Sequence, residues 1–172
     1  PAAGRLLALL AIQDAEDTVA DPACGSGMLL VKAYQRKRQL YGIDRYQHKT
    51  VLREIFGNDI SVFATVLTTL NLVSQQVTSW TNKIDVFTGN AFNLLLRDPN
   101  TLNEHLQQRV TRSGVDGVER GYQEAIEVDA IVANPPFVRR QNLSTAQRRD
   151  LTEFSRTHYN LNYKGDIAGN FL

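Results

Sequence analysis

The stretch TVADPACGSG (residues 18–27) joins a short apolar strand to a glycine-rich turn. The residues that follow, MLLVKAYQRKRQL (28–40), are helix-prone, with apolar side chains early and basic side chains late, which suits the helix dipole. Glycines at such a turn let the backbone bend tightly and approach a ligand closely. The stretch therefore predicts a strand, a ligand-facing turn and a helix in succession.

Strands and helices also alternate in the rest of the chain. Further strands are predicted at EIFGNDI (54–60), KIDVFTGNA (83–91) and VDAIVANPP (128–136), and a helix at SVFATVLTTLNLVSQQ (61–76). This alternation indicates an α/β fold with a parallel sheet, in which ligands gather at the carboxyl ends of the strands. Each predicted strand ends in polar or glycine-rich residues, so we expect one composite site at that edge of the sheet.

The apolar patterns of two predicted helices indicate which faces are buried. GRLLALLAI (4–12) is apolar nearly all round and is predicted to be a buried helix. Ser61 suits the N-cap position of the helix at 61–76. The i, i+3, i+4, i+7 spacing of an amphipathic helix is met by Phe63, Val66, Leu67 and Leu70. These apolar side chains are therefore expected to face the core.

Length and composition suit one domain with a sizeable core. The chain has 172 residues, of which 42% are hydrophobic and 22% charged, and its formal net charge of +1 neither demands nor excludes a nucleic-acid partner. The single cysteine excludes an intrachain disulfide, no apolar run reaches transmembrane length, and the histidines lack metal-ligand spacing, so no metal site is expected. The chain begins at Pro1 and stops at GNFL without a cap, so we expect a piece of a longer protein. A surface insertion is predicted at 97–127, partly helical around 102–110.

The glycine-rich turn carries a carboxylate at its start. Asp21 ends the first strand, and Gly25 and Gly27 follow it. The sequence lacks the GxxxxGK[ST] pattern, which argues against a phosphate-cradling loop. A carboxylate is a poor neighbour for a pyrophosphate and a good one for an ammonium group. A tight turn with a capping Asp is the structural alternative.

A nucleoside ligand needs a ribose partner, usually an acid at the end of the second strand. Asp44 has the nearer spacing, but the residues before it, QRKRQL, do not form an apolar strand. Asp59 is farther along, ends a predicted strand and precedes a helix. We therefore choose Asp59 and interpret 39–53 as an added helix or loop. Alternatively, Asp59 is an acid favoured by the helix dipole.

Together these pieces resemble the S-adenosylmethionine-dependent DNA adenine methyltransferases that modify an exocyclic amine. DPACGSG is similar to their cofactor loop, FGNDISVFATVLTTLNL to their second motif, and NPPF (134–137) to their catalytic motif. NPPFVRRQNL further resembles the Eco57I-like type IIG group of restriction–modification enzymes, beside which type I methylases remain an option. The resemblance implies a Rossmann-like class I methyltransferase fold over 1–172, with helices on both faces of the sheet. It also implies that the last strands and the target-recognition domain lie outside this chain.

The resemblance implies S-adenosyl-L-methionine as the cofactor and assigns its contacts by position. Asp21 would hold the methionine ammonium, Asp59 the ribose hydroxyls, and Ile60 would pack on the cofactor adenine. Asn90 stands where the family usually has Asp for the adenine amine, and an amide oxygen can still accept that hydrogen bond. The remaining cofactor-binding candidates supply backbone: Ala23, Cys24, Gly25, Gly27 and Ala91.

NPPF would form the target-base site. The side-chain oxygen of Asn134 and the carbonyl of Pro135 are two acceptors for the amine hydrogens, Pro136 stiffens the turn, and Phe137 offers a stacking face. The expected partner is double-stranded DNA with the base flipped out. A fused or separate specificity domain and a nuclease are further expected partners, with no membrane, in a prokaryotic cytoplasm. A structural turn with a core Phe is the alternative for these residues.

Three functional alternatives remain open from the sequence. Enzymes that methylate guanine in RNA or glutamine in proteins also use an Asn-Pro-Pro-aromatic motif. A non-catalytic remnant that binds cofactor or DNA is the third possibility.

Overall fold

The computed structural model describes the chain at residues 2–79, 81, 84–89, 91, 110–112, 120–122, 128–135, 137–139, 143–146, 148–149, 152–153, 156 and 167–169. The chain divides into two compact units, Pro1–Asn134 and Pro135–Phe171, each of which is described by itself. Among the described residues no helix is both long and apolar enough to cross a membrane.

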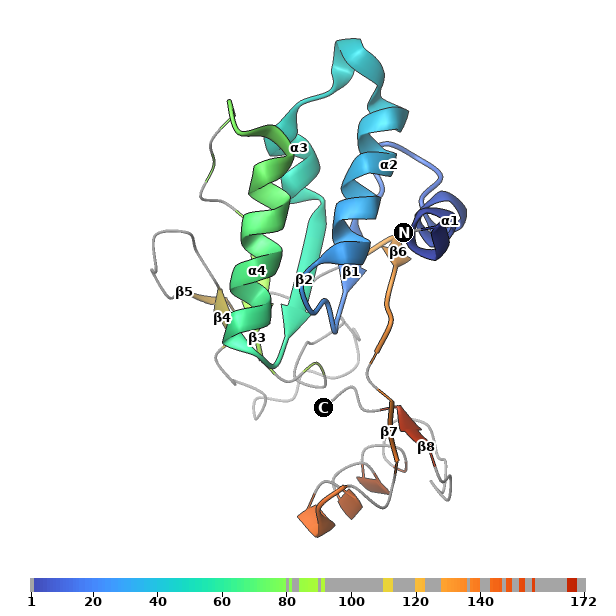
Figure 1. Ribbon diagram of the computed structural model, residues 1–172, viewed down its shortest axis with the longest axis vertical. Helices are drawn as coiled ribbons and strands as arrows, with labels where there is room; N and C mark the ends of the chain where they lie inside the picture. The colour runs from blue at the N-terminus through green and yellow to red at the C-terminus, as the bar shows by residue number, and fades with distance from the viewer. Residues whose placement is uncertain are drawn as a thin grey trace. The chain divides into compact units, whose positions relative to one another are not determined.

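A six-stranded sheet in the order β5-β4-β3-β2-β1-β6 forms the centre of the first unit (Figure 1). Its parallel part consists of β1 (Val19–Asp21), β2 (Ile55–Asp59), β3 (Asp85–Thr88) and β6 (Ala130–Ile131). The short strands β4 (Val110–Arg112) and β5 (Arg120–Tyr122) extend it beyond β3 in antiparallel fashion. The predicted α/β fold with a mostly parallel sheet is therefore confirmed.

The strand order places a topological switch point at β1. The chain runs from β1 to β2 to β3 in one direction and then returns to the other side of β1 as β6. In open α/β sheets of this kind, ligands bind in the crevice outside the carboxyl ends of the strands at the switch point. The first strand end, with its glycine-rich turn, and the fourth, with Asn134, are therefore neighbours.

The predicted strand at 128–136 is shorter than expected. β6 covers only Ala130–Ile131, although the Val132 amide still donates to the Ala20 carbonyl at 2.9 Å. Tandem prolines lack the amide donors that a sheet ladder needs, so pairing stops before them. The helix expected around 102–110 lies outside the described residues except at Val110, which begins β4.

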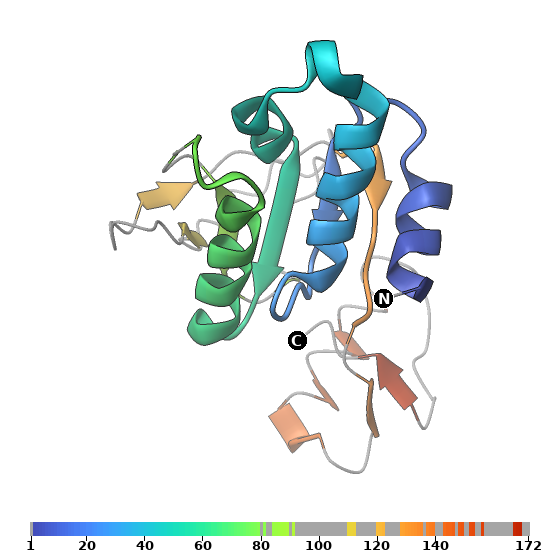
Figure 2. The same ribbon diagram turned by 45° about the horizontal axis from the view of Figure 1, so that its top comes forward.

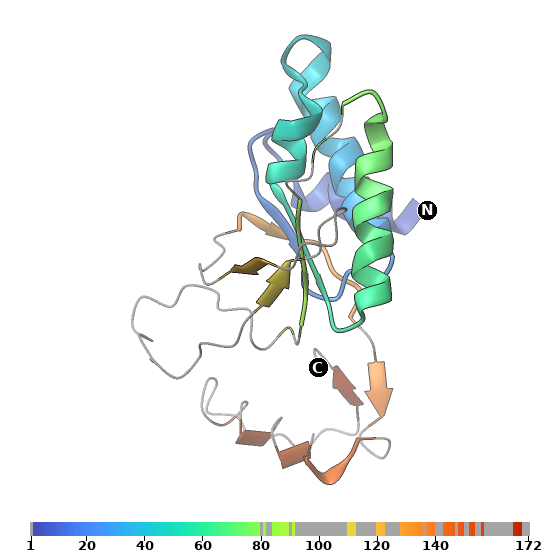
Figure 3. The ribbon, with the colours of Figure 1, turned by 90° about the vertical axis from the view of Figure 1, so that its left-hand side faces the viewer.

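Three helices lie side by side on one face of this sheet: α1 (Ala2–Ala11), α2 (Met28–Arg45) and α4 (Val62–Val73) (Figures 1 and 2). Figure 3 views the sheet from the side, with α2 and α4 on the same side of the strands. The short α3 (His48–Arg53) precedes β2. The 3-10 helix η1 (Ser74–Gln76) follows α4. The prediction of helices on the second face is not tested by the residues that the structure describes.

The prediction that the first helix is buried all round was wrong. Only Gly4 and Ala8 of α1 are buried, whereas Leu6, Leu9 and Leu10 are at least half exposed. A single stripe of α1 faces α2, where a Cβ on Gly4 would already lie 3.1 Å from Leu29. Leu7 is partly buried and packs against the core beside this stripe, whereas Leu6, Leu9 and Leu10 face outward.

The prediction for the inner face of α4 was also wrong. Phe63 is 74% exposed, and Val66 and Leu70 are exposed as well, while Leu67 is half-buried. The side chains that face inward are instead Thr65, Thr68, Thr69, Leu72 and Val73. This face lies against the glycine-rich turn, whose backbone carbonyls need hydrogen-bond donors that leucine or phenylalanine cannot supply.

A buried lysine links the base of the sheet to α2. Lys37 is fully buried, forms an ion pair with Glu54 at 3.0 Å and donates to the carbonyls of Ala15, at 2.5 Å, and Asp17. These contacts fix the loop before β1 and the start of β2 relative to each other. Buried charge of this kind is tolerated only when paired and hydrogen-bonded.

The second unit contains a two-stranded antiparallel sheet of β7 (Phe137–Arg139) and β8 (Ile167–Gly169). Leu143 is buried there, and the guanidinium group of Arg148 donates to its carbonyl at 2.9 and 3.0 Å.

Candidate functional site

The turn between β1 and α2 needs glycine at two positions for different reasons. Gly25 and Gly27 have φ of +54° and +79°, a region that other residues rarely adopt. A Cβ on Gly27 would lie 2.8 Å from the Cγ2 of Thr68, so no side chain fits there. A Cβ on Gly25 would meet nothing within 4 Å, so Gly25 borders open space. The turn is thus closed by Thr68 at Gly27 and open at Gly25.

The amides of this turn are held by the ends of β1 and β2. The Ala23 amide donates to Asp21 Oδ1 at 3.1 Å, and the Gly25 amide to Asp59 Oδ2 at 2.9 Å. The Cys24 amide donates to the Asn58 carbonyl at 2.8 Å. Acceptors from the adjacent strand therefore fix the path of the turn before any ligand arrives.

The carbonyls of the turn are held by β2 and α4. The Pro22 carbonyl accepts from Asn58 Nδ2 at 3.1 Å. The Gly25 carbonyl accepts from the Thr68 hydroxyl at 2.8 Å, and the Ser26 carbonyl from Asn71 Nδ2 at 2.9 Å. Thr68 and Asn71 of α4 therefore hold the turn from behind, which explains why a polar residue stands at position 68.

Asp21 is a buried carboxylate beside this turn. Only 2% of the residue is exposed, and its Oδ1 accepts the Ala23 amide. Burial raises the pKa of the Asp21 carboxyl to about 7; the Ala23 hydrogen bond opposes this rise, and the charge of Asp59 adds to it. Within the described part of the chain, no cationic side chain forms an ion pair with Asp21. A cationic group of a ligand beside Asp21 would therefore stabilise the ionised form of its carboxyl group.

Cys24 is inert by comparison. It is buried, and burial raises the pKa of its thiol to about 12. The Thr68 hydroxyl lies 3.4 Å from its sulfur. A neutral, enclosed thiol is not a nucleophile at neutral pH, so Cys24 contributes its backbone.

Asp59 ends β2, as predicted, next to the glycine-rich turn. Its Oδ2 accepts the Gly25 amide and its Oδ1 accepts the Ser61 amide, both at 2.9 Å. Ile60 follows and is 62% exposed, which leaves an apolar surface at the rim. The competing candidate, Asp44, lies near the end of α2 and is exposed.

The end of β3 is tied to the end of β2. The Gly89 amide donates to the Asp59 carbonyl at 3.0 Å, and Asn58 Nδ2 donates to the Gly89 carbonyl at the same distance. The half-buried Ala91 follows, whereas Asn90 lies outside the described residues. The strand end that should carry the adenine contacts is thus beside Asp59.

Asn134 is exposed at the end of the first unit, two residues past Val132. β6 pairs with β1 in parallel, with Ala20 opposite Ile131, and Asn134 follows Ile131 by three residues at the same end of the sheet as Asp21. In the second unit Pro135 is half-buried and Phe137 begins β7, but the Phe137 side chain and Pro136 lie outside the described residues.

The sequence interpretation missed the residues that support the turn: Asn58, Thr68 and Asn71. Thr68 and Asn71 are three residues apart on one face of a helix with many apolar residues, which is a signal of a polar contact behind that face. Asn58 is buried in a strand that is otherwise apolar up to Asp59. Its Oδ1 is buried and accepts no hydrogen bond from the part of the chain that the structure describes.

No group of three His, Cys, Asp or Glu side chains among the described residues is arranged to hold a metal ion. The donors gathered at the strand ends are carboxylates, amides and backbone groups beside an open glycine turn. Such a set suits an organic ligand that carries an ammonium group and hydroxyls.

Comparison with known proteins agrees with this arrangement. The family model described as N-6 DNA Methylase matches residues 3–168, which include all four parallel strands and the NPPF motif. No curated protein matches the chain. With this match over nearly its whole length, the chain belongs to the N-6 DNA methylase family, a family of DNA methyltransferases.

Proposed function

We propose that the chain binds S-adenosylmethionine at the turn after β1 and transfers its methyl group to the exocyclic amine of adenine in DNA, as part of a restriction–modification system. The observation that carries the proposal is Asp21. It is a buried carboxyl group with a raised pKa, without an ion-pair partner among the described residues, beside a glycine turn that is open towards ligand.

The residues present fit this cofactor. The methionine ammonium would pair with Asp21, which would lower the pKa of that carboxyl and keep it ionised. Each Asp59 oxygen accepts one amide and retains a further lone pair for a ribose hydroxyl. The exposed Ile60 offers an apolar surface to the cofactor adenine, and Asn90 and Ala91 would complete that pocket. The pre-held turn lowers the ordering cost of binding.

When bound, the cofactor supplies a methyl group that is already electrophilic on a sulfonium sulfur. The role of the protein is to make the adenine amine nucleophilic, because its lone pair is delocalised into the ring. The Asn134 side-chain oxygen and the Pro135 carbonyl would each accept a hydrogen bond from one N–H of the amine. These two hydrogen bonds would localise the lone pair on the nitrogen. Pro136 would stiffen the turn and Phe137 would stack on the base, which leaves the duplex at a cost of a few kcal/mol. Positioning, rather than a strong base or metal, drives the transfer.

Two other substrates remain as alternatives on the same scaffold: guanine in RNA and glutamine in a protein. The family match favours DNA. A non-catalytic remnant would retain the turn but lack the transfer reaction.

The decisive experiment is to express the full-length protein and measure N6-methyladenine in host DNA by mass spectrometry. We expect N6-methyladenine at specific sites. Methylated guanine in ribosomal RNA, without modified DNA, would refute the proposal. Calorimetry of the chain with S-adenosylmethionine, read together with the mass spectrometry, tests the remnant hypothesis: a remnant would bind the cofactor or DNA while no methylated product forms.

A further inference from the structure

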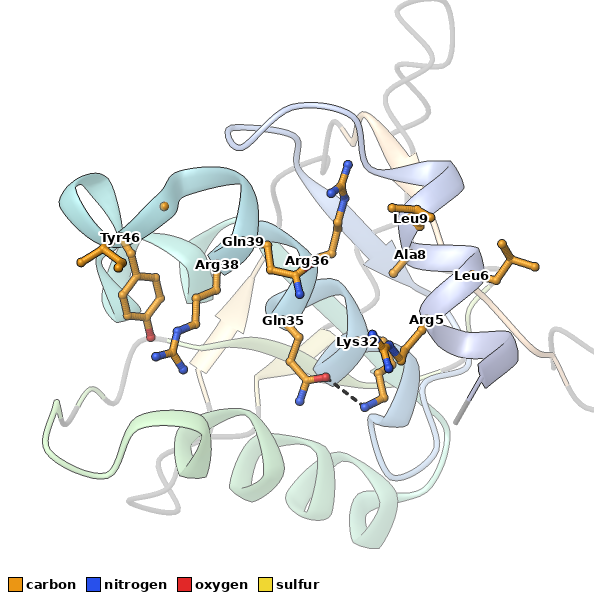
Figure 4. A pocket seen from close by; sticks show the side chains of 12 residues that line it. Arg5, Leu6, Ala8, Leu9, Lys32, Gln35, Arg36, Arg38, Gln39 and Tyr46 are labelled. Carbon is orange, nitrogen blue, oxygen red and sulfur yellow. Dashed lines mark hydrogen bonds between the residues drawn. The ribbon is translucent and has the colours of Figure 1, made fainter.

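A groove of about 780 Å³ lies between α1 and α2, and none of the residues that line it belongs to the strand-end site described above (Figure 4). α1 and α2 provide its basic residues: Arg5, Lys32, Arg36 and Arg38. No carboxylate lines the groove. A concave surface with one sign of charge concentrates ligands of the opposite charge.

The polar residues of α2 form a continuous stripe along the groove. Lys32, Gln35, Arg36 and Gln39 follow the i, i+3, i+4, i+7 spacing of one helix face. From Lys32 to Gln39 the stripe runs about 10 Å along the helix axis, or two turns. Arg5 adds a cation from the facing helix. The groove therefore presents an extended row of donors, not a single point charge.

These cations are available to a ligand. None of them forms an ion pair with a carboxylate in the part of the chain that the structure describes. The ammonium group of Lys32 donates to Gln35 Oε1 at 2.9 Å, and the guanidinium group of Arg38 lies 5.0 Å from the ring centroid of Tyr46. Arg36 is fixed to the backbone, through Nε to the Ile12 carbonyl at 3.2 Å. Neutral partners leave the positive charge uncompensated.

Exposed apolar side chains lie among the cations. Leu6 and Leu9 line the groove from α1 and are at least half exposed, and Ile43 lines it from α2 and is 97% exposed. Leu6 and Leu9 lie on α1 at one end of the groove, whereas Ile43 follows the kink of α2 at Gly42. Exposed apolar groups beside polar residues mark interaction surfaces. A nucleic-acid phosphate backbone would pair with the cations but would leave the exposed apolar side chains without a partner. A neutral apolar ligand would contact those side chains but would leave the cations without a partner.

We infer that this groove is a docking surface for an acidic amphipathic helix of another polypeptide. One face of such a helix would place leucine-like anchors on Leu6 and Leu9, with the i, i+3, i+4, i+7 spacing of groove-bound helices. Its glutamates and aspartates would meet Arg5, Lys32 and Arg36. Both features of the groove, its charge and its exposed apolar groups, are then satisfied by one occupant.

The test uses a fluorescein-labelled acidic amphipathic peptide built from Leu, Glu and Ala, titrated with the full chain and followed by fluorescence anisotropy. A peptide of the same composition in scrambled order, without an apolar face, is the reference. We expect the amphipathic peptide to bind at least tenfold more tightly than the scrambled one. Equal affinity for the amphipathic and the scrambled peptide would mean that the groove attracts acidic peptides only by non-specific charge, and this would overturn the inference.

Variants of the chain locate the binding. The double variant Arg5→Glu, Lys32→Glu reverses charge in the groove, and Lys49→Glu, Arg53→Glu makes the same change in net charge at exposed positions of α3, outside the groove. We expect the first to weaken peptide binding at least tenfold and the second less than twofold. Leu6→Ser, Leu9→Ser should also weaken it, because the apolar contact is lost. Equal effects of the two charge variants would refute the groove as the site.

A duplex DNA of 20 base pairs is titrated in parallel to separate the competing ligand. If the groove variant loses DNA binding while the peptide binds all variants alike, the groove is a DNA contact and the inference fails. Circular dichroism and calorimetry with S-adenosylmethionine check that each variant folds and keeps the strand-end site. If the unmodified protein does not bind S-adenosylmethionine, the proposed function is refuted, but the measurement of peptide binding to the groove still stands.

Discussion

Replacing Thr68 by Val tests whether α4 holds the glycine-rich turn in its binding geometry. The Thr68 hydroxyl donates to the Gly25 carbonyl at 2.8 Å, and the residue is fully buried. Valine keeps the shape but removes the donor, so the Gly25 carbonyl loses this hydrogen bond at a cost of about 1–3 kcal/mol. If that cost falls on the bound geometry of the turn, affinity for S-adenosylmethionine should fall by roughly 5- to 150-fold.

The matched control is Thr69→Val, one residue further along the same helix. Thr69 is also buried, but its hydroxyl has no hydrogen-bond partner among the described residues. Removing an unsatisfied buried hydroxyl should leave stability equal or higher and cofactor affinity unchanged. Isothermal titration calorimetry and thermal unfolding measure both quantities. Unchanged cofactor affinity in Thr68→Val, or an equal loss of affinity in both variants, would show that the Thr68 hydrogen bond does not hold the turn for binding.

Three further predictions concern the buried acid, the buried ion pair and the end of β6. Burial raises the pKa of Asp21 to about 7 in the folded chain, so the folded state binds more protons than the unfolded state between about pH 4 and 7. The free energy of unfolding should therefore fall as the pH rises through that window, by up to about 4 kcal/mol. Urea titrations at several pH values measure this profile, and Asp21→Asn should flatten it. Lys37→Met leaves Glu54 charged and half-buried, so it should destabilise the chain by about 3 kcal/mol; adding Glu54→Gln should recover part of the loss, and a fully additive double variant would contradict this role. Asn134→Ala should abolish methyl transfer while calorimetry shows S-adenosylmethionine binding largely intact, and equal loss of both would argue against its assignment to the target base.

The parallel arrangement of the site was accessible from the sequence because strand ends carry their own signals. An apolar run followed by polar or glycine residues marks the carboxyl end of a buried parallel strand. That pattern identified the ends of β1, β2 and β3, and it favoured Asp59 over Asp44, which has no strand before it. Parallel topology then brings those ends to one edge without any further information.

The inner face of α4 was not accessible in the same way. Its apolar residues have ideal amphipathic spacing, yet Phe63 and Leu70 face outward and Thr68 faces inward. Periodicity says which residues share a face, but not whether the neighbour on that face is apolar. Here the neighbour is a glycine turn whose carbonyls at Gly25 and Ser26 require donors, so hydrogen bonding outweighs apolar burial.

By itself, therefore, the sequence determined the order of β1, β2, β3 and β6 with α2 and α4, the edge of the sheet at which a site is expected, and the residue types at that edge. Only the tertiary structure decided which helix faces are covered, that Lys37 is buried with Glu54, and that α1 and α2 leave a basic groove between them. The physical reason is that local patterns fix dihedral preferences and periodicity, which act over a few residues. Burial and charge pairing depend on neighbours distant in sequence, and those exist only once the sheet and its helices have assembled.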